Sequence, residues 1–259
     1  MRIKDTMRQA YNLNSNWTFR GCSGSVHHVD IPHTWNNQDG QDGGNDYWRG
    51  KCVYEKSFSA PEFGTDERVY LEFAGVNASA KVIVNGTVAM THDGGYSTFR
   101  CDVTALLKDQ NNLAVEVDNS VNDRVYPQKA DFTFYGGIYR DVKLIVVNRH
   151  HFDLDYFGGP GIAVHAEVKG QDAFVWVRTW HNAKNGTVAI TIKDAEGNAV
   201  KGDAILLNSK NSYFNTRKTV AAIGVENLVV VESDKAILVC SKDMVQDVKK
   251  AAEQFNTRS

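Results

Sequence analysis

The sequence predicts a mainly β protein: a jelly-roll β-sandwich, then a partial immunoglobulin-like β domain, then a short α+β tail ending in an amphipathic helix. Short apolar or alternating runs, separated by Gly, Asn and Asp clusters, fill residues 13–147, and a shorter group follows over residues 152–192. Runs of this length and pattern are typical of strands. Apolar residues at helical spacing occur over residues 244–255.

The first segment has the clearest strand pattern. Asn85-Gly86 directly follows an apolar run and predicts a hairpin, because a type I′ turn needs positive φ at both central residues. Residues 103–108 predict a brief helical turn. Many short strands with so little helix favour an antiparallel sandwich or jelly roll. The strand-like runs are residues 69–73, 80–84, 113–117 and 142–147.

The second segment contains three strand-like runs, at residues 162–168, 173–180 and 188–192. An immunoglobulin-type domain needs about seven strands, so we expect only part of one. Further strand-like runs follow at residues 205–207, 219–223, 228–232 and 236–240.

The C-terminal helix is expected to begin at Asp243 as N-cap, with Gln246 three residues on. The tail shows no internal repeat. The expected domains are residues 11–147, 150–200 and 201–259.

Composition excludes several classes of protein. The 259 residues are 42% hydrophobic and 23% charged, which is typical of a globular chain and not of a disordered one. The net charge of -2 gives no electrostatic reason to expect nucleic acid or a membrane as partner. The polar N-terminus and the lack of long apolar stretches predict a cytoplasmic location.

No catalytic, metal or cofactor motif stands out. The chain has no GxSxG, HExxH, Walker or dinucleotide-binding motif, so we expect no cofactor and no catalytic residue. The four cysteines lie far apart without CxxC spacing, which indicates reduced thiols. Residues 39–46 bring three carboxylates into one Gly-rich loop. This loop either binds a cation or folds back through Asx turns.

Aromatic and acidic residues gather near the end of the first segment. Aromatic faces stack on the C–H surface of a sugar, while carboxylates and amides bind its hydroxyls. The alternative is a structural loop whose aromatic rings close the end of the sandwich. The candidate sugar-binding residues are Asn119, Asp123, Asp131, Phe132 and Tyr135.

Several motifs in this segment resemble the N-terminal sugar-binding jelly roll of glycoside hydrolase family 2, the β-galactosidase and β-glucuronidase family. The resemblance covers residues 11–147, looks most like the β-galactosidase branch, and continues into the start of the following immunoglobulin-like domain. The motifs are His33-Thr34-Trp35-Asn36, Asp46-Tyr47-Trp48-Arg49-Gly50, Phe73-Ala74-Gly75-Val76, Val84-Asn85-Gly86 and Phe134-Tyr135-Gly136-Gly137-Ile138-Tyr139-Arg140-Asp141-Val142.

The resemblance implies that catalysis belongs to two glutamates on a later TIM barrel, which this chain does not reach. It also implies roles in binding a β-galactoside. Asn119 and Asp131 are expected to bind hydroxyls, Phe132 and Tyr135 to form walls, and Asp123 to be a further candidate.

From about residue 201 the tail resembles instead the C-terminal end of a mannose-1-phosphate guanylyltransferase core, through Lys201-Gly202-Asp203 and residues 220–232. The favoured hypothesis is a truncated, non-catalytic sugar-binding portion of a β-galactosidase-like enzyme. The alternatives are a β-galactosidase fragment that hydrolyses β-galactosides only with a separately supplied barrel, and a guanylyltransferase remnant. Self-association is expected through apolar faces that include Phe174, Trp176, Ile223 and Val230.

Overall fold

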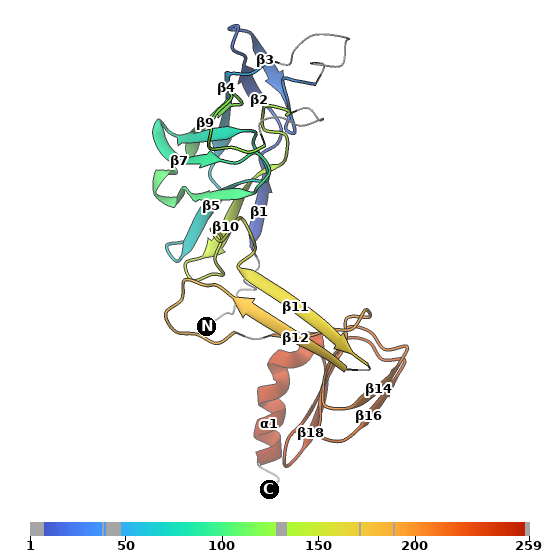
Figure 1. Cartoon of the computed structure of the whole chain (residues 1–259). Helices are drawn as coiled ribbons and strands as arrows, with labels where there is room; N and C mark the ends of the chain where they lie inside the picture. Colours follow the sequence, from blue (N-terminus) through green and yellow to red (C-terminus); the bar gives the residue numbers. More distant parts are fainter. Residues whose placement is uncertain are drawn as a thin grey trace. The chain divides into compact units, whose positions relative to one another are not determined.

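The computed structural model describes residues 8–37, 39, 48–127, 134–170, 172–188 and 190–256. Its internal contacts divide the chain into two units, the first ending at Lys184 and the second beginning at Asn185 (Figure 1). Within the described residues, no helix is long and apolar enough to cross a membrane.

Two antiparallel sheets form the main body of the first unit. One has six strands in the order β3-β2-β4-β9-β6-β7, and the other has four in the order β1-β10-β5-β8. The predicted jelly-roll sandwich is therefore confirmed. The strands are β1 (Gln9–Asn12), β2 (Trp17–Arg20), β3 (Val26–Val29), β4 (Lys51–Ser59), β5 (Glu67–Phe73), β6 (Ser79–Val84), β7 (Thr87–Asp93), β8 (Phe99–Asp102), β9 (Gln110–Asp118) and β10 (Val142–Asn148).

The core of the sandwich follows from the alternation of apolar residues along each strand. In β9 the buried positions alternate with half-buried or exposed ones, because successive side chains point to opposite faces of the sheet. The side chains of Trp17, Tyr54 and Phe73 are completely buried in this core. Burial raises the pKa of the Tyr54 hydroxyl far above its usual value, so this hydroxyl stays protonated.

The predicted hairpin between β6 and β7 is also confirmed. Asn85 and Gly86 have φ of 52° and 83°, as a type I′ turn requires. The Asn85 amide donates hydrogen bonds to the Leu106 carbonyl and to Asn111 Oδ1, both at 2.8 Å. These bonds tie the hairpin to the short 3-10 helix η1 (Thr104–Leu106), which lies in the predicted helical turn.

A two-stranded antiparallel ribbon, β11 (Ile162–Lys169) and β12 (Asp172–Thr179), completes the first unit. The third strand expected at residues 188–192 was predicted wrongly, because the described residues of that segment form no strand. Ile190 and Ile192 are 56% and 64% exposed. An apolar run becomes a strand only where a neighbouring strand accepts its hydrogen bonds, and this run has no such neighbour among the described residues.

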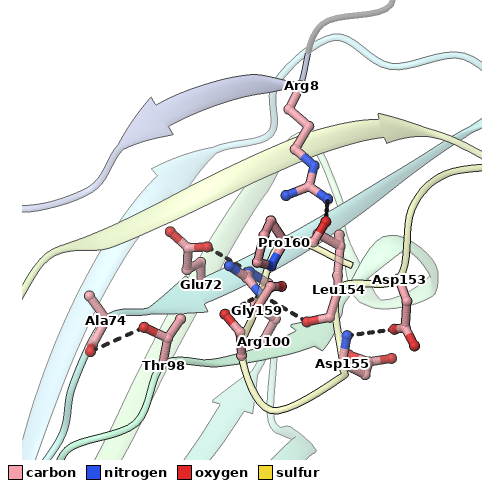
Figure 2. A network of polar contacts seen from close by, with 11 residues as sticks. Arg8, Glu72, Ala74, Thr98, Arg100, Asp153, Leu154, Asp155, Gly159 and Pro160 are labelled. Carbon is pink, nitrogen blue, oxygen red and sulfur yellow. Dashed lines mark hydrogen bonds and ion pairs between the residues drawn. The ribbon is translucent and has the colours of Figure 1, made fainter. Parts of the chain in front are cut away.

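A buried arginine joins the sandwich to the segment that precedes the ribbon (Figure 2). Arg100 on β8 pairs with Glu72 on β5 at 2.6 Å, and only 8% and 16% of their side chains are exposed. The Arg100 guanidinium also donates hydrogen bonds to the carbonyls of Leu154, Gly158 and Gly159 at 2.9 to 3.0 Å. Arg100 therefore ties this segment to the four-stranded sheet, together with Leu154, which packs against Tyr70 on β5 and Ile145 on β10.

Gly158 allows that close approach. It has φ of +66°, and a Cβ at this position would lie 2.0 Å from the Thr98 carbonyl oxygen. Glycine adopts this backbone conformation without steric cost, whereas any other residue would push the segment away from β8.

The second unit is a small parallel coil. β13, β15 and β17 pair in parallel, as do β14 and β16, and β18 closes one edge in antiparallel orientation. A 3-10 helix, η2 (Lys242–Asp247), and helix α1 (Val248–Asn256) follow. The strands are β13 (Ala199–Lys201), β14 (Ala204–Leu207), β15 (Tyr213–Asn215), β16 (Val220–Ile223), β17 (Leu228–Glu232) and β18 (Ile237–Ser241).

The coil contains a repeat that the sequence analysis missed. Gly197, Asn211 and Asn227 occupy equivalent corners of successive turns, and all three have positive φ. Asn211 Nδ2 donates to Asn227 Oδ1 at 2.5 Å, so the corners are also linked by side chains. What repeats is the backbone conformation at the corners, and both Gly and Asn can adopt positive φ. The successive turns therefore share few identical residues, and the repeat is not evident from the sequence.

Two smaller expectations for the tail were wrong. Val230 is 8% exposed and packs with Phe214 and Ala222 in the core of the coil, whereas Ile223 is 66% exposed as expected. The C-terminal helical segment begins after Ser241 and has no side-chain cap there, so Asp243 is not its N-cap.

We predict that Arg100→Met lowers the free energy of unfolding by about 3–5 kcal/mol, because it leaves the buried Glu72 carboxylate without its partner. Chemical denaturation measures this loss, and hydrogen exchange should show faster opening of residues 153–160. Arg20→Met is the matched control, because its pair with Glu55 is about half exposed and contributes less than about 1 kcal/mol. Equal losses in the two variants would contradict the role of Arg100.

A second prediction concerns pH. His33 Nδ1 lies 2.8 Å from the Tyr54 hydroxyl, and burial, followed by the charge of His27, lowers the pKa of His33. The pKa of His33 is therefore lower in the folded chain than in the unfolded chain, where it is about 6.5. As the pH falls below about 6.5, the unfolded chain takes up a proton at His33 more readily than the folded chain, so the free energy of unfolding falls. One such proton contributes a slope of at most about 1.4 kcal/mol per pH unit.

The variant His33→Gln keeps a hydrogen-bonding group beside Tyr54 but does not titrate. We expect a shallower loss of unfolding free energy between pH 7 and 5 than in the unmodified chain, measured by denaturation at each pH. An unchanged slope would show that other groups, such as His92, whose pKa is also lowered by burial, account for the pH dependence.

Candidate functional site

The β3–β4 and β9–β10 connections meet at one end of the sandwich around the side chain of Asn36, which is completely buried. Asn36 Nδ2 donates to a carboxylate oxygen of Asp39 at 2.7 Å and to the Trp48 carbonyl at 2.9 Å. Its Oδ1 accepts a hydrogen bond from the Gly136 amide at 2.7 Å. One amide therefore joins two parts of the β3–β4 connection to the Gly136 segment of the β9–β10 connection.

Asn119, which directly follows β9, belongs to the same network. Its Oδ1 accepts from the Gly50 amide at 2.8 Å, and its Nδ2 donates to Asn36 Oδ1 at 3.3 Å. The residue is 3% exposed. Both polar atoms of Asn119 are thus used within the protein, and its expected contact with a sugar hydroxyl stays a prediction.

Gly136 and Gly137 are required by close packing. A Cβ on Gly136 would lie 2.3 Å from the Trp35 ring and 2.6 Å from Asn119 Nδ2. Gly137 has φ of +130°, and a Cβ there would lie 2.6 Å from the His33 carbonyl oxygen. The Gly-Gly pair therefore lets this segment lie directly on the network beneath it.

Beside this network lies a shallow hollow of about 210 Å³. Tyr135 is 38% exposed at its edge, and its backbone carbonyl accepts a hydrogen bond from Asn77 Nδ2 at 2.9 Å. The hydroxyl of Tyr139 donates to the Gly95 carbonyl, and burial raises the pKa of Tyr139. The lining residues are Pro32, His33, Thr34, Tyr135 and Tyr139.

The other expected sugar-binding residues do not line this hollow within the part of the chain that the structure describes. Asp131 and Phe132 lie outside the described residues. Asp123 is exposed, and its neighbour Arg124 pairs with Asp93 at 2.8 Å. That pairing, with a further hydrogen bond from Ser79, lowers the pKa of Asp93. The roles of Asp123, Asp131 and Phe132 therefore stay predictions.

The acidic loop is described only at Asp39, since residues 40–47 lie outside the described part. The Asp39 carboxylate accepts hydrogen bonds from the Trp48 amide at 2.8 Å and from Asn36. Across the residues that can be searched, no three His, Cys, Asp or Glu side chains gather as a metal site would require.

Sequence reasoning missed Asn36, Asp39 and Trp48 as parts of this site. Asn36 closes the motif that begins at His33, but an asparagine in a loop has no feature in the sequence that separates a buried hub from an exposed turn residue. Its importance follows only from burial and from partners up to 100 residues away.

The tail of the chain has relatives of its own. Residues 202–255 match the MannoseP isomerase/GMP-like beta-helix domain, in agreement with the parallel coil. A mannose-1-phosphate guanylyltransferase of Escherichia coli is 41% identical over 93 residues, which are 36% of this chain and 18% of that protein.

The first unit resembles glycosidases. A β-glucuronidase of Bacteroides fragilis is 38% identical over 203 residues, and a β-galactosidase of Thermoanaerobacter pseudethanolicus is 38% identical over 109 residues. These matches cover 74% and 40% of this chain but only 29% and 15% of the relatives. The chain therefore spans less than a third of the length of these relatives.

A solved structure agrees with the sequence matches. The FMN-binding β-glucuronidase from Facaelibacterium prausnitzii L2-6 superposes with a TM-score of 0.65 at 45% identity, over 68% of this chain and 28% of the other. Residues 15–148, more than half of the chain, match the family model described as glycosyl hydrolases family 2, sugar binding domain. The chain therefore belongs to glycosyl hydrolase family 2, through the sugar binding domain of that family.

Proposed function

We propose that the first unit is a non-catalytic sugar-binding module, and that it binds one sugar ring of a β-galactoside in the hollow beside Tyr135. The exposed ring of Tyr135, fixed above the buried Asn36 network, is the observation that carries the proposal. The family 2 match over residues 15–148 supports carbohydrate as the ligand class.

The size of the hollow favours a small ligand. Its volume of about 210 Å³ lies below the roughly 300–1,000 Å³ of sites that enclose drug-sized molecules. It therefore suits a single ring and not an oligosaccharide. The rings of Pro32, Tyr135 and Tyr139 provide flat apolar walls, on which the C–H face of a pyranose can stack.

His33 is the polar group best placed to select a hydroxyl. Its Nδ1 faces the buried Tyr54 hydroxyl at 2.8 Å, so its Nε2 is directed away from the core. Among the described residues Nε2 has no hydrogen-bond partner, and His33 lines the hollow. Because burial lowers the pKa of His33, the ring is neutral at pH 7 and binds a hydroxyl without a charge.

The site also includes residues proposed from the sequence. Asp131 is proposed to accept hydrogen bonds from sugar hydroxyls, with Asp123 as a further candidate and Phe132 as a second wall. Asn119 is assigned an indirect role through the network, since both its polar atoms bond to protein. None of these carboxylates is proposed to hydrolyse a glycosidic bond, because that hydrolysis requires a matched pair of carboxyl groups.

We predict millimolar binding of galactose and lactose to the full chain in calorimetric titration, with no turnover of chromogenic β-galactosides or β-glucuronides. Tyr135→Ala and Asp131→Ala should each weaken binding at least tenfold. Tyr11→Ala is the matched control, because Tyr11 is 39% exposed on β1 and does not line the hollow.

The outcomes separate the parts of the proposal. Binding of a methyl glucuronide in preference to galactose would keep the site and replace the substrate class. Equal loss in Tyr135→Ala and Tyr11→Ala would exclude the hollow. Turnover by the purified chain would contradict a non-catalytic module.

A further inference from the structure

The tetrapeptide Asn-Gly-Thr-Val occurs twice in the chain, at residues 85–88 and at residues 185–188, and these are the two Asn-Gly pairs of the sequence. An asparagine that precedes glycine loses its side-chain amide readily, because glycine has no Cβ to keep its backbone nitrogen away from the asparagine Cγ. The two sites share this local sequence. A large difference in reactivity between them must therefore come from the fold.

Loss of the amide needs no reagent except water. The backbone nitrogen of the glycine gives up its proton and bonds to the asparagine Cγ, which expels the side-chain nitrogen as ammonia and closes a five-membered succinimide ring. Water then adds to one of the two ring carbonyls and opens the ring to aspartate or isoaspartate. The asparagine side chain must first rotate until Cγ lies against the next backbone nitrogen. Hydrogen bonds that hold the side chain elsewhere therefore slow the reaction.

Asn85 is held away from that geometry. Its Nδ2 donates to the Leu106 carbonyl and to Asn111 Oδ1, both at 2.8 Å, and its Oδ1 accepts from the Asn112 amide at 2.9 Å. The backbone is fixed as well, because Asn85 and Gly86 form the tight turn between β6 and β7. Rotation of the side chain breaks all three hydrogen bonds together, and the fold therefore protects Asn85.

Asn185 has none of these restraints. Asn185 and Gly186 are exposed and belong to no helix or strand. Among the described residues, no hydrogen bond holds the Asn185 side chain. Gly186 does not have the positive φ of Gly86, and apart from its chain neighbours no described atom lies within 4 Å of the place that a Cβ would take. The Asn185 side chain is therefore free to rotate against the Gly186 nitrogen.

We propose that Asn185 is a site of spontaneous deamidation in the folded chain and that Asn85 is not. The product is a mixture of aspartate and isoaspartate at residue 185, and either one adds one negative charge. Isoaspartate also adds one carbon atom to the main chain. Residue 185 is the first residue of the second compact unit and lies outside the strands, so the altered backbone interrupts no sheet.

The test follows both asparagines in one sample. The full chain is incubated at 37 °C in mildly alkaline buffer and digested at acidic pH, and the peptides that contain residues 85 and 185 are analysed by mass spectrometry. We expect Asn185 to deamidate at least tenfold faster than Asn85, and enzymatic methylation to detect isoaspartate at residue 185. In guanidinium chloride the two rates should agree within about twofold, because the two tetrapeptides are the same.

Gly186→Ala separates the ring closure from exposure alone. A methyl group at residue 186 hinders the attack, so deamidation of Asn185 should slow at least tenfold, and the open space there accommodates the added Cβ. Lys184→Ala is the matched control, because it changes the exposed residue on the other side of Asn185 and leaves the attacking nitrogen unaltered. Its rate should stay within about twofold of the unmodified chain.

Equal rates at Asn185 and Asn85 in the folded chain, or no reaction at Asn185, would overturn the proposal. So would a tenfold difference that persists in guanidinium chloride, since the fold would then not be its cause. Equal slowing by Gly186→Ala and Lys184→Ala would also contradict it, because the reaction would not then depend on attack by the Gly186 nitrogen.

Discussion

The loop end of the sandwich depends on the buried amide of Asn36. A side-chain amide offers two donors and one oxygen with two lone pairs, and Asn36 uses them to join two parts of the β3–β4 connection to the β9–β10 connection. An unpaired buried amide costs about 1–3 kcal/mol, so the loops and the amide hold one another in place. The position of Tyr135 follows from this, because Gly136 is its immediate neighbour and is fixed by Asn36.

The same principle operates at Arg100, but with a charge. Its Nε donates to one carboxylate and its Nη1 donates to three carbonyls, and together these bonds compensate for the loss of water around the guanidinium. The buried groups do not create the sandwich, whose sheets are held by the apolar core. They fix which irregular segments lie against the sandwich. These segments border the hollow and lead into the ribbon.

The sequence predicted the parts of the fold that depend on local pattern. Alternation placed the strands of the sandwich, and Asn85-Gly86 located a hairpin from backbone chemistry alone. It could not predict Asn36, whose role depends on partners distant in sequence, nor the failure of residues 188–192 to form a strand, which depends on a missing neighbour. For Asn119 it predicted a contact with a sugar, which stays a prediction, while the buried hydrogen bonds of that residue appear only once the β3–β4 and β9–β10 connections are folded together.

The distribution of buried apolar residues explains why the two units differ in architecture. Among the described residues, 24 form the main core cluster of the sandwich, against three in the coil. With so small a core, the coil relies on hydrogen bonds between successive turns, and its Asn corners add side-chain bonds to that ladder. The β11 and β12 ribbon has neither a core nor a ladder beyond its own two strands. Among the β structures that the described residues form, the ribbon therefore has the least support of its own.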